Sequence, residues 1–136
     1  MDTDVLDYRM SRTVELPYAD AVEQTRKALA DEGFGILSEI DVAATLKTKL
    51  KADFRPYVIL GTCNPSLAHR ALTAEPDIGV LLPCNVVVYA ADAPGRSVIA
   101  AVDPETSLAR VGNDALRPVA ADVKARLRRV LDRVAG

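Results

Sequence analysis

Aromatic residues are scarce in this chain of 136 residues: it contains no tryptophan, and Phe and Tyr together make up 4% of it. Hydrophobic residues nevertheless account for 49% of the chain. A core must therefore be built from Val, Leu, Ile and Ala rather than from large rings. Because this length suits one domain that buries a proper core, we expect a single domain over residues 1–136.

The chain also lacks an excess of positive charge and a long apolar run, and we expect no secretory signal. Its net charge is −2 and its pI is near 5.4, whereas nucleic-acid binding needs a basic surface. The acidic start Met1-Asp2-Thr3-Asp4 does not resemble a secretory signal. The longest apolar stretch, Ile78–Ala91, is interrupted by Pro83 and Asn85 and is too short to cross a bilayer of about 30 Å. We expect a soluble cytoplasmic protein without nucleic-acid or membrane partners.

Only two cysteines are present, and their spacing is not C-x-x-C. This usage is typical of a reducing compartment in which thiols stay free. A disulfide between Cys63 and Cys84 remains the alternative. The chain has no G-x-S-x-G, no phosphate-cradling glycine loop and no H-E-x-x-H. The sequence therefore indicates no particular reaction.

Hydrophobic periodicity and turn residues predict strands and helices in mixed order. The predicted strands cover Tyr8–Leu16, Phe34–Ile40, Tyr57–Leu60, Cys84–Tyr89 and Ser97–Val102, and the predicted helices cover Tyr18–Gly33, Val42–Lys51, Pro65–Ala74, Pro104–Arg110 and Pro118–Val134. The continuous apolar run Tyr57–Leu60 is typical of a strand that is buried on both faces.

The last helix is rich in arginine, which indicates a solvated face. Within it we expect Asp122 to pair with Arg126. We also expect Asp132 to pair with Arg128 or Arg129.

Two similar tripeptides carry the candidate site: Cys63-Asn64-Pro65 and Pro83-Cys84-Asn85. Each lies at the end of an apolar run, and the only histidine, His69, lies between them. We expect the two segments to come together in the fold. The predicted ligand-binding residues are Cys63, Asn64, His69, Cys84 and Asn85.

The two cysteines allow two interpretations each. Cys63 is predicted just before the N-terminus of a helix, where the helix dipole lowers a thiol pKa. Alternatively it is a small buried residue in a tight turn. Cys84 belongs either to the core or to the same site. If His69 lies close to Cys63 and acts as a base, Cys63 is the candidate nucleophile. Alternatively, His69 is a surface residue.

The asparagines also have structural roles open to them. Asn64 is a natural N-cap, with Pro65 at the first helical position. Asn85 starts an apolar strand and needs a partner for its amide. That partner is a backbone carbonyl, a ligand or the Asn64 turn.

Cys63, His69 and Cys84 would together offer one nitrogen and two sulfur ligands, which are ligand types that zinc and copper accept. The usual closely spaced ligand pairs are absent, however. We therefore expect no metal and no cofactor.

Several segments together resemble the family known as domain of unknown function 302. They are Glu39–Val42, Leu60–Pro65, Ala68-His69 with Ala71-Leu72, and Ile78–Val88. The resemblance implies an α+β fold: a curved antiparallel sheet with helices on one face, similar to the half-repeat of the TATA-binding-protein fold. It also implies a homodimer, and it implies no function.

The resulting hypothesis is a homodimeric small-molecule-binding module, with a pocket near the Cys63-Asn64 and Cys84-Asn85 turns. One alternative is a thiol-dependent enzyme or redox sensor that uses Cys63. The other is a purely structural role, in which the two asparagines satisfy each other's backbone.

Overall fold

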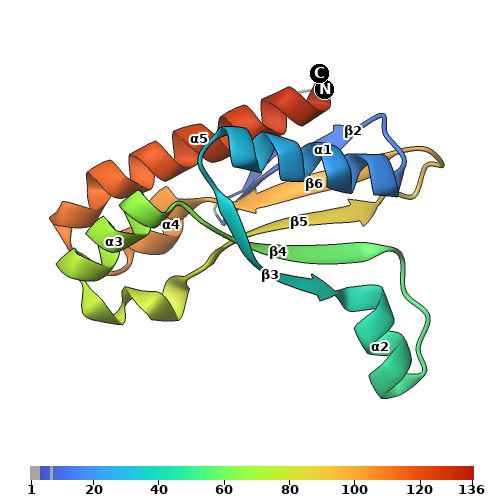
Figure 1. Cartoon of the computed structure of the whole chain (residues 1–136), viewed down its shortest axis with the longest axis horizontal. Coiled ribbons are helices and arrows are strands. Elements are labelled where there is room, and N and C mark those ends of the chain that lie inside the picture. Colours follow the sequence, from blue (N-terminus) through green and yellow to red (C-terminus); the bar gives the residue numbers. More distant parts are fainter. Residues whose placement is uncertain (1–3, 7) are drawn as a thin grey trace.

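The computed structural model describes residues 4–6 and 8–136, which form a six-stranded antiparallel sheet and a layer of helices (Figure 1). The strand order is β1-β2-β6-β5-β4-β3. The strands are β1 (Asp4–Leu6), β2 (Arg9–Val14), β3 (Gly35–Asp41), β4 (Tyr57–Cys63), β5 (Cys84–Ala90) and β6 (Ser97–Val102). The helices are α1 (Tyr18–Asp31), α2 (Val42–Leu50), α3 (Pro65–Ala74), α4 (Pro104–Ala109) and α5 (Arg117–Ala135), with 3-10 turns η1 (Pro76–Leu81) and η2 (Asp114–Leu116). The α+β fold is as predicted.

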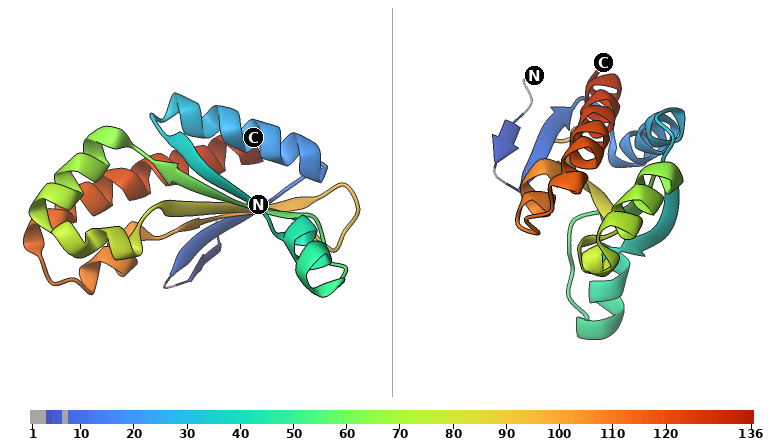
Figure 2. Two further views of the ribbon diagram at one scale, coloured as in Figure 1. Left: turned by 60° about the horizontal axis from the view of Figure 1, so that its bottom comes forward. Right: turned by 90° about the vertical axis from the view of Figure 1, so that its left-hand side faces the viewer.

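Helices α1 and α5 cover one face of the twisted sheet (Figure 2). Helix α5 turns an apolar stripe inward, because its hydrophobic residues recur every three or four positions. The buried residues of α5 are Val119, Ala120, Val123, Leu127, Val130, Leu131 and Val134. Alternate residues of the central strands meet that stripe, and Val86, Val88 and Leu60 are fully buried. The core therefore lies between the sheet and these two helices.

Helix α2 follows β3 and projects from the sheet on the side away from α1 and α5 (Figure 2). Its N-cap is Asp41, whose carboxylate accepts a hydrogen bond from the Ala44 N–H at 2.9 Å. None of its residues is buried, and Leu50 is 70% exposed. An isolated helix of nine residues is marginally stable in water. This helix therefore depends on its contacts with β3 and β4.

The prediction that Tyr57–Leu60 is buried on both faces was wrong for the single chain. Val58 and Leu60 face the helices and are buried, whereas Tyr57 and Ile59 face the other way and are only partly buried. In the described part of the chain, no helix covers this second face (Figure 2). We call it the open face.

Other differences are small and have local causes. β2 is shorter than the predicted strand Tyr8–Leu16, and the strand β1 that pairs with it was not predicted because three residues carry no periodicity. Helix α5 begins at Arg117, one residue before Pro118, which occupies its first turn where no N–H is needed.

The predicted pairing of Asp132 within α5 was wrong, whereas that of Asp122 with Arg126 was confirmed at 2.8 Å. Asp132 binds Arg12 on β2, and Arg129 instead binds Glu32 at 2.9 Å. The partners of Asp132 and Arg129 lie on packed neighbouring elements, and sequence spacing alone does not show them.

Candidate functional site

A cavity of about 260 Å³ opens at the end of the sheet where β4 leads into α3 and η1 leads into β5. Its walls come from these segments together with α4 and α5. The lining residues are Phe34, Leu37, Thr62, Cys63, Asn64, Leu67, Ala68, Ala71, Leu72, Gly79, Leu81, Leu82, Pro83, Cys84, Val102, Pro104, Ser107, Leu108, Val119 and Val123. The cavity is larger than the roughly 150 Å³ that suffices for a benzene-sized ligand.

Among the described residues, the lining carries no charged side chain, although charged residues make up 26% of the chain. Polar groups enter only through Thr62, Cys63, Asn64, Cys84 and Ser107. The first four lie together where β4 and β5 pair. The cavity is thus apolar, with one polar corner.

The pairing of β4 with β5 brings the two Cys-Asn segments side by side. Thr62 lies opposite Cys84, and Gly61 lies opposite Asn85. The Thr62 hydroxyl also donates a hydrogen bond to the Cys84 carbonyl at 2.9 Å. The expected juxtaposition of the two segments is therefore confirmed.

Gly61 allows the chain to cross closely at this point. A Cβ there would collide with Ser38 Oγ and would lie 2.9 Å from Pro83 Cγ. Such an approach is too close for a side-chain carbon, so only glycine fits without a shift of its neighbours. Gly61 thereby lets Pro83 fold over β4 just before Cys84 enters the sheet.

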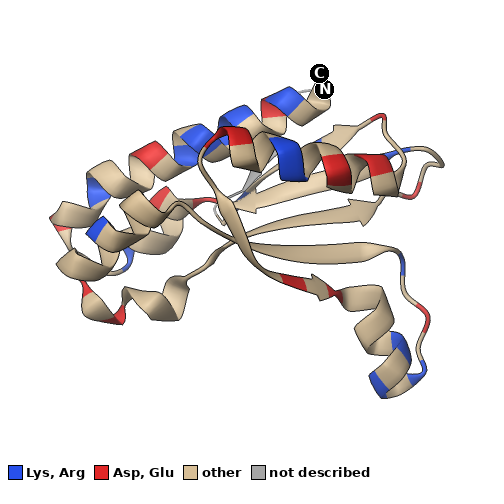
Figure 3. Ribbon diagram, in the orientation of Figure 1, with Lys and Arg blue, Asp and Glu red and all other residues tan. Residues whose placement is uncertain are grey.

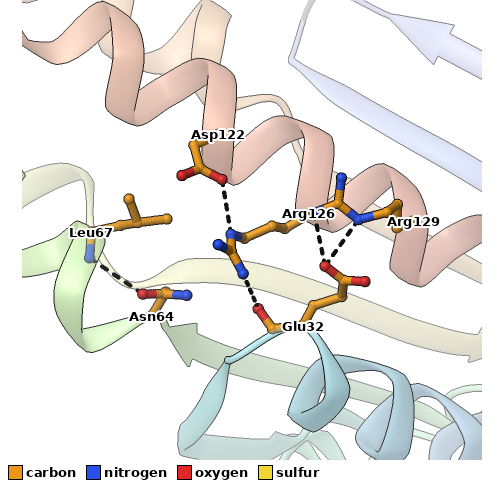
Figure 4. A network of polar contacts seen from close by, with 6 residues as sticks. All are labelled: Glu32, Asn64, Leu67, Asp122, Arg126 and Arg129. Carbon is orange, nitrogen blue, oxygen red and sulfur yellow. Dashed lines mark hydrogen bonds and ion pairs between the residues drawn. The ribbon is translucent and has the colours of Figure 1, made fainter.

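Asn64 caps α3, as predicted. Its Oδ1 accepts a hydrogen bond from the Leu67 N–H at 3.3 Å (Figure 4). Its amide nitrogen lies close to Gly33, whose φ of +85° lets the chain turn from α1 into β3. The cap thus closes the cavity wall beside the end of α1.

Arg126 of α5 lies at the same junction and joins α5 to the end of α1. Its guanidinium donates to Asp122 at 2.8 Å and to the Glu32 carbonyl at 2.9 Å (Figure 4). Glu32 in turn accepts from Arg129 at 3.0 Å. These contacts hold the C-terminus of α1 against α5, beside the cavity but outside its lining.

Both thiols are free and lie on the cavity wall. Burial, followed by the neighbouring Cys63, raises the pKa of the Cys84 thiol from 9.0 to about 11. Cys84 therefore stays protonated at neutral pH, and a neutral thiol is a poor nucleophile.

His69 and Asn85 do not join this cavity. His69 is exposed on α3 and is not among the lining residues. Asn85 pairs with Gly61 but is exposed, and its side chain points to the open face because its neighbours Cys84 and Val86 point to the helix side. Among the described residues, no hydrogen bond joins Asn85 to Asn64. The structure thus brings together Cys63, Asn64 and Cys84 of the five predicted residues.

The described residues contain no group of three or more His, Cys, Asp or Glu side chains placed to hold a metal ion. In particular, His69 does not join the two thiols in the cavity lining.

Much of the wall was missed by sequence reasoning. Leu108, Val119 and Val123 come from α4 and α5, and in the sequence they are indistinguishable from ordinary core residues. Thr62 carried the one available signal, a hydroxyl inside an apolar strand next to Cys63.

An α+β domain with an uncharged cavity at one end of its sheet is a class shared by many unrelated proteins. The comparisons are more specific. The model of the family "Domain of unknown function DUF302" matches residues 10–134, so the chain belongs to this family. The resemblance stated from the sequence is thereby confirmed.

A solved relative has the same fold. The crystal structure of an uncharacterized conserved protein DUF302 from Bacillus stearothermophilus is 34% identical, with a TM-score of 0.85 over 93% of this chain and 97% of that one. A search of curated proteins finds no match. Within the described residues, no helix is long and apolar enough to cross a membrane.

Proposed function

We propose that the protein is a homodimeric module that binds a small, uncharged, largely apolar molecule in the cavity beside Cys63, Asn64 and Cys84. One observation carries the ligand class: no charged side chain in the described part of the chain lines this cavity of about 260 Å³, although 26% of the chain is charged. A charged ligand would lose its hydration there without gaining an ion-pair partner. Burial likewise raises the pKa of the Cys84 thiol, because the charged thiolate is disfavoured away from water.

The polar corner supports an orientation for the ligand. Thr62 already donates to the Cys84 carbonyl, and Asn64 Oδ1 already accepts from Leu67. The groups that remain for a ligand are the Asn64 amide N–H and the two thiols, which are donors. A ligand with a hydrogen-bond acceptor, such as a carbonyl or ether oxygen, at one end of a hydrocarbon body therefore fits best.

The homodimer and the cytoplasmic location belong to the same proposal. The homodimer rests on the family resemblance, and the location rests on the two free thiols.

The thiol-dependent alternative has less support. Cys63 lies on the cavity wall just before the N-cap of α3, but the base expected for it, His69, lies outside the lining. A purely structural clasp also has less support, because Asn64 caps its own helix while Asn85 points to the open face.

A matched pair of fluorescent probes tests the ligand class. N-phenyl-1-naphthylamine is uncharged, and 8-anilinonaphthalene-1-sulfonate has the same rings plus a sulfonate. We expect saturable binding of the uncharged probe at one site per chain. The sulfonate should bind at least about tenfold more weakly, because burying an unpaired charge costs several kcal/mol.

Two variants of α3 locate the binding site. Ala68→Leu adds volume inside the cavity, since Ala68 is a lining residue. Thr73→Leu makes a similar apolar addition on an exposed position of the same helix, outside the lining. We expect Ala68→Leu to weaken the uncharged probe at least about tenfold and Thr73→Leu to leave it unchanged. Equal binding by both variants, or no saturable binding by the unmodified chain, would refute the proposal.

A further inference from the structure

The open face of the sheet carries a continuous apolar surface that no described helix covers. Strand residues alternate between the faces, so Val87 points away from the helices that cover Val86 and Val88. The pairing register places Ile40, Ile59, Val87 and Ala100 in one row across four strands, and Tyr57, Tyr89 and Val98 in the next row.

The residues named in these two rows are uncharged, and the Arg55 guanidinium lies over the Tyr89 ring at 5.8 Å. The rings of Tyr57 and Tyr89 stack at 5.1 Å, and Phe54 lies 6.1 Å from Tyr57. Ile40 and Phe54 are 47% and 48% exposed, and Leu50 on the adjoining α2 is 70% exposed. Contiguous apolar surface of this kind, continued from a sheet onto a helix, is typical of a protein–protein interface.

The size of the surface favours a large partner. Four strands about 4.8 Å apart and about six residues long, at about 3.3 Å per residue, span roughly 19 by 20 Å, or about 380 Å². A stable interface buries about 800 Å² on each partner. The sheet alone falls short, so the partner must also cover α2 with Leu50 and Phe54.

The charges at the two ends of the open face point to a second copy of this chain. Helix α2 and its C-cap carry Lys47, Lys49 and Lys51, whereas Asp77 in η1 and its N-cap Glu75 are acidic. These two elements lie at opposite ends of the strands (Figure 3). A two-fold axis in the plane of the interface and perpendicular to the strands reverses the ends. It therefore brings the basic end of each copy to the acidic end of the other, as a self-complementary interface requires.

We infer that two copies of the chain pack open face to open face, with Lys49 of each copy against Asp77 of the other. The inference deepens the homodimer part of the proposed function by naming its surface, and it is independent of the ligand part. It also explains why β4 has the sequence pattern of a strand that is buried on both faces: the second copy covers the second face.

The centre of the surface is tested with Val87→Glu, and Ala125→Glu on the exposed side of α5 is the matched control. Analytical ultracentrifugation over a range of concentrations gives the dimer dissociation constant. We expect Val87→Glu to raise this constant at least about 100-fold, because the buried carboxylate finds no partner in the apolar rows. Ala125→Glu should leave it within about twofold of the unmodified value.

Charge reversal at the rim provides a test that does not disturb the fold, because Lys49 and Asp77 are both exposed. We expect Lys49→Glu and Asp77→Lys each to weaken the dimer by about three- to tenfold at low salt. The double variant should return to within about twofold, because each copy then presents the reversed charges to the other.

Each outcome has a distinct meaning. A dimer that is insensitive to Val87→Glu, or a double variant that is weaker than both single variants, would overturn this interface while leaving a homodimer in place. A monomer at every concentration of the unmodified chain would overturn the homodimer as well. Binding of N-phenyl-1-naphthylamine reports on the cavity separately and checks that Val87→Glu is folded.

Discussion

The two faces of the sheet are built from similar residues but are used differently. On the helix face, Val86 and Val88 are fully buried. On the open face, Val87, one residue from each of them, is only partly buried. The residue type is the same and so is the strand; only the covering layer differs. The stability of the chain should therefore come from the helix face, and its capacity for association from the open face.

Truncating neighbouring valines measures this contrast most directly. Val86→Ala removes two methyl groups from a closed core, and we expect it to lower the free energy of unfolding by about 2–3 kcal/mol, through lost burial and an unfilled cavity. Val87→Ala removes the same groups from the open face and should cost less than about 1 kcal/mol. The measurement is urea denaturation at a protein concentration well below the dimer dissociation constant.

Varying the protein concentration distinguishes the contributions of the two faces further. The cost of Val87→Ala should grow as the protein concentration is raised, because association stabilises the folded state by mass action. The cost of Val86→Ala should not change in this way. Equal costs at low concentration would contradict the difference between the faces.

Much of the fold was predictable, because its signals are local. Helix α3 has an N-cap Asn64 followed by Pro65, and α5 has an apolar stripe along its whole length. The hairpin of β5 and β6 follows from two apolar runs and the turn between them. What the sequence did not show is which surface covers a strand. The run Tyr57–Leu60 has the same letters whether its second face meets a helix, a second chain or solvent.

The candidate site was predictable only in part. Its polar corner was found because Cys63, Asn64 and Cys84 interrupt apolar runs, and adjacent antiparallel strands bring such points together. The roles of His69 and Asn85 depend on side-chain direction. A one-residue step along a strand turns a side chain to the opposite face, and this separates Asn85 from Cys84. The apolar wall from α4 and α5 carries no sequence signal that distinguishes it from core.

Ion pairs allow a second test of the same contrast. On the helix side, buried Asp103 caps α4 through the Glu105 N–H at 3.0 Å and binds Lys124 of α5 at 2.9 Å. Near the open face, Lys47 binds Asp53 at 2.8 Å, but Asp53 is 92% exposed. We expect Asp103→Ala to lower the free energy of unfolding by about 2 kcal/mol, from the lost cap and from the loss of one of the two carboxylates that bind Lys124, the other being Glu105. Asp53→Ala should cost less than about 0.5 kcal/mol.

Salt provides the control for this pair of variants. The small effect of Asp53→Ala should vanish at high ionic strength, because exposed charges are screened. Most of the effect of Asp103→Ala should persist, because a capping hydrogen bond to a buried carboxylate is screened little. Loss of both effects in salt would show that Asp103 acts only as a surface charge.

The smallest expected effect is a pH dependence that originates at the cavity. The pKa of Cys84 is raised from 9.0 to about 11, first by burial and then by Cys63. The folded chain therefore holds the thiol proton more tightly than the unfolded chain does. Its contribution to stability is complete below pH 9 and is lost as the pH rises from about 9 toward 11, because the unfolded state releases its proton first. At pH 10 the loss should be about 1 kcal/mol.

The variant Cys84→Ala isolates this contribution from that of lysines and tyrosines, which titrate in the same range. Urea denaturation at pH 8 and at pH 10 should show a smaller fall in stability for Cys84→Ala than for the unmodified chain, by about 1 kcal/mol. An uncharged ligand that fills the cavity should keep water away from the thiol and enlarge the difference. Parallel curves for the two proteins would mean that Cys84 is hydrated and that the cavity is not the low-dielectric site that an apolar ligand requires.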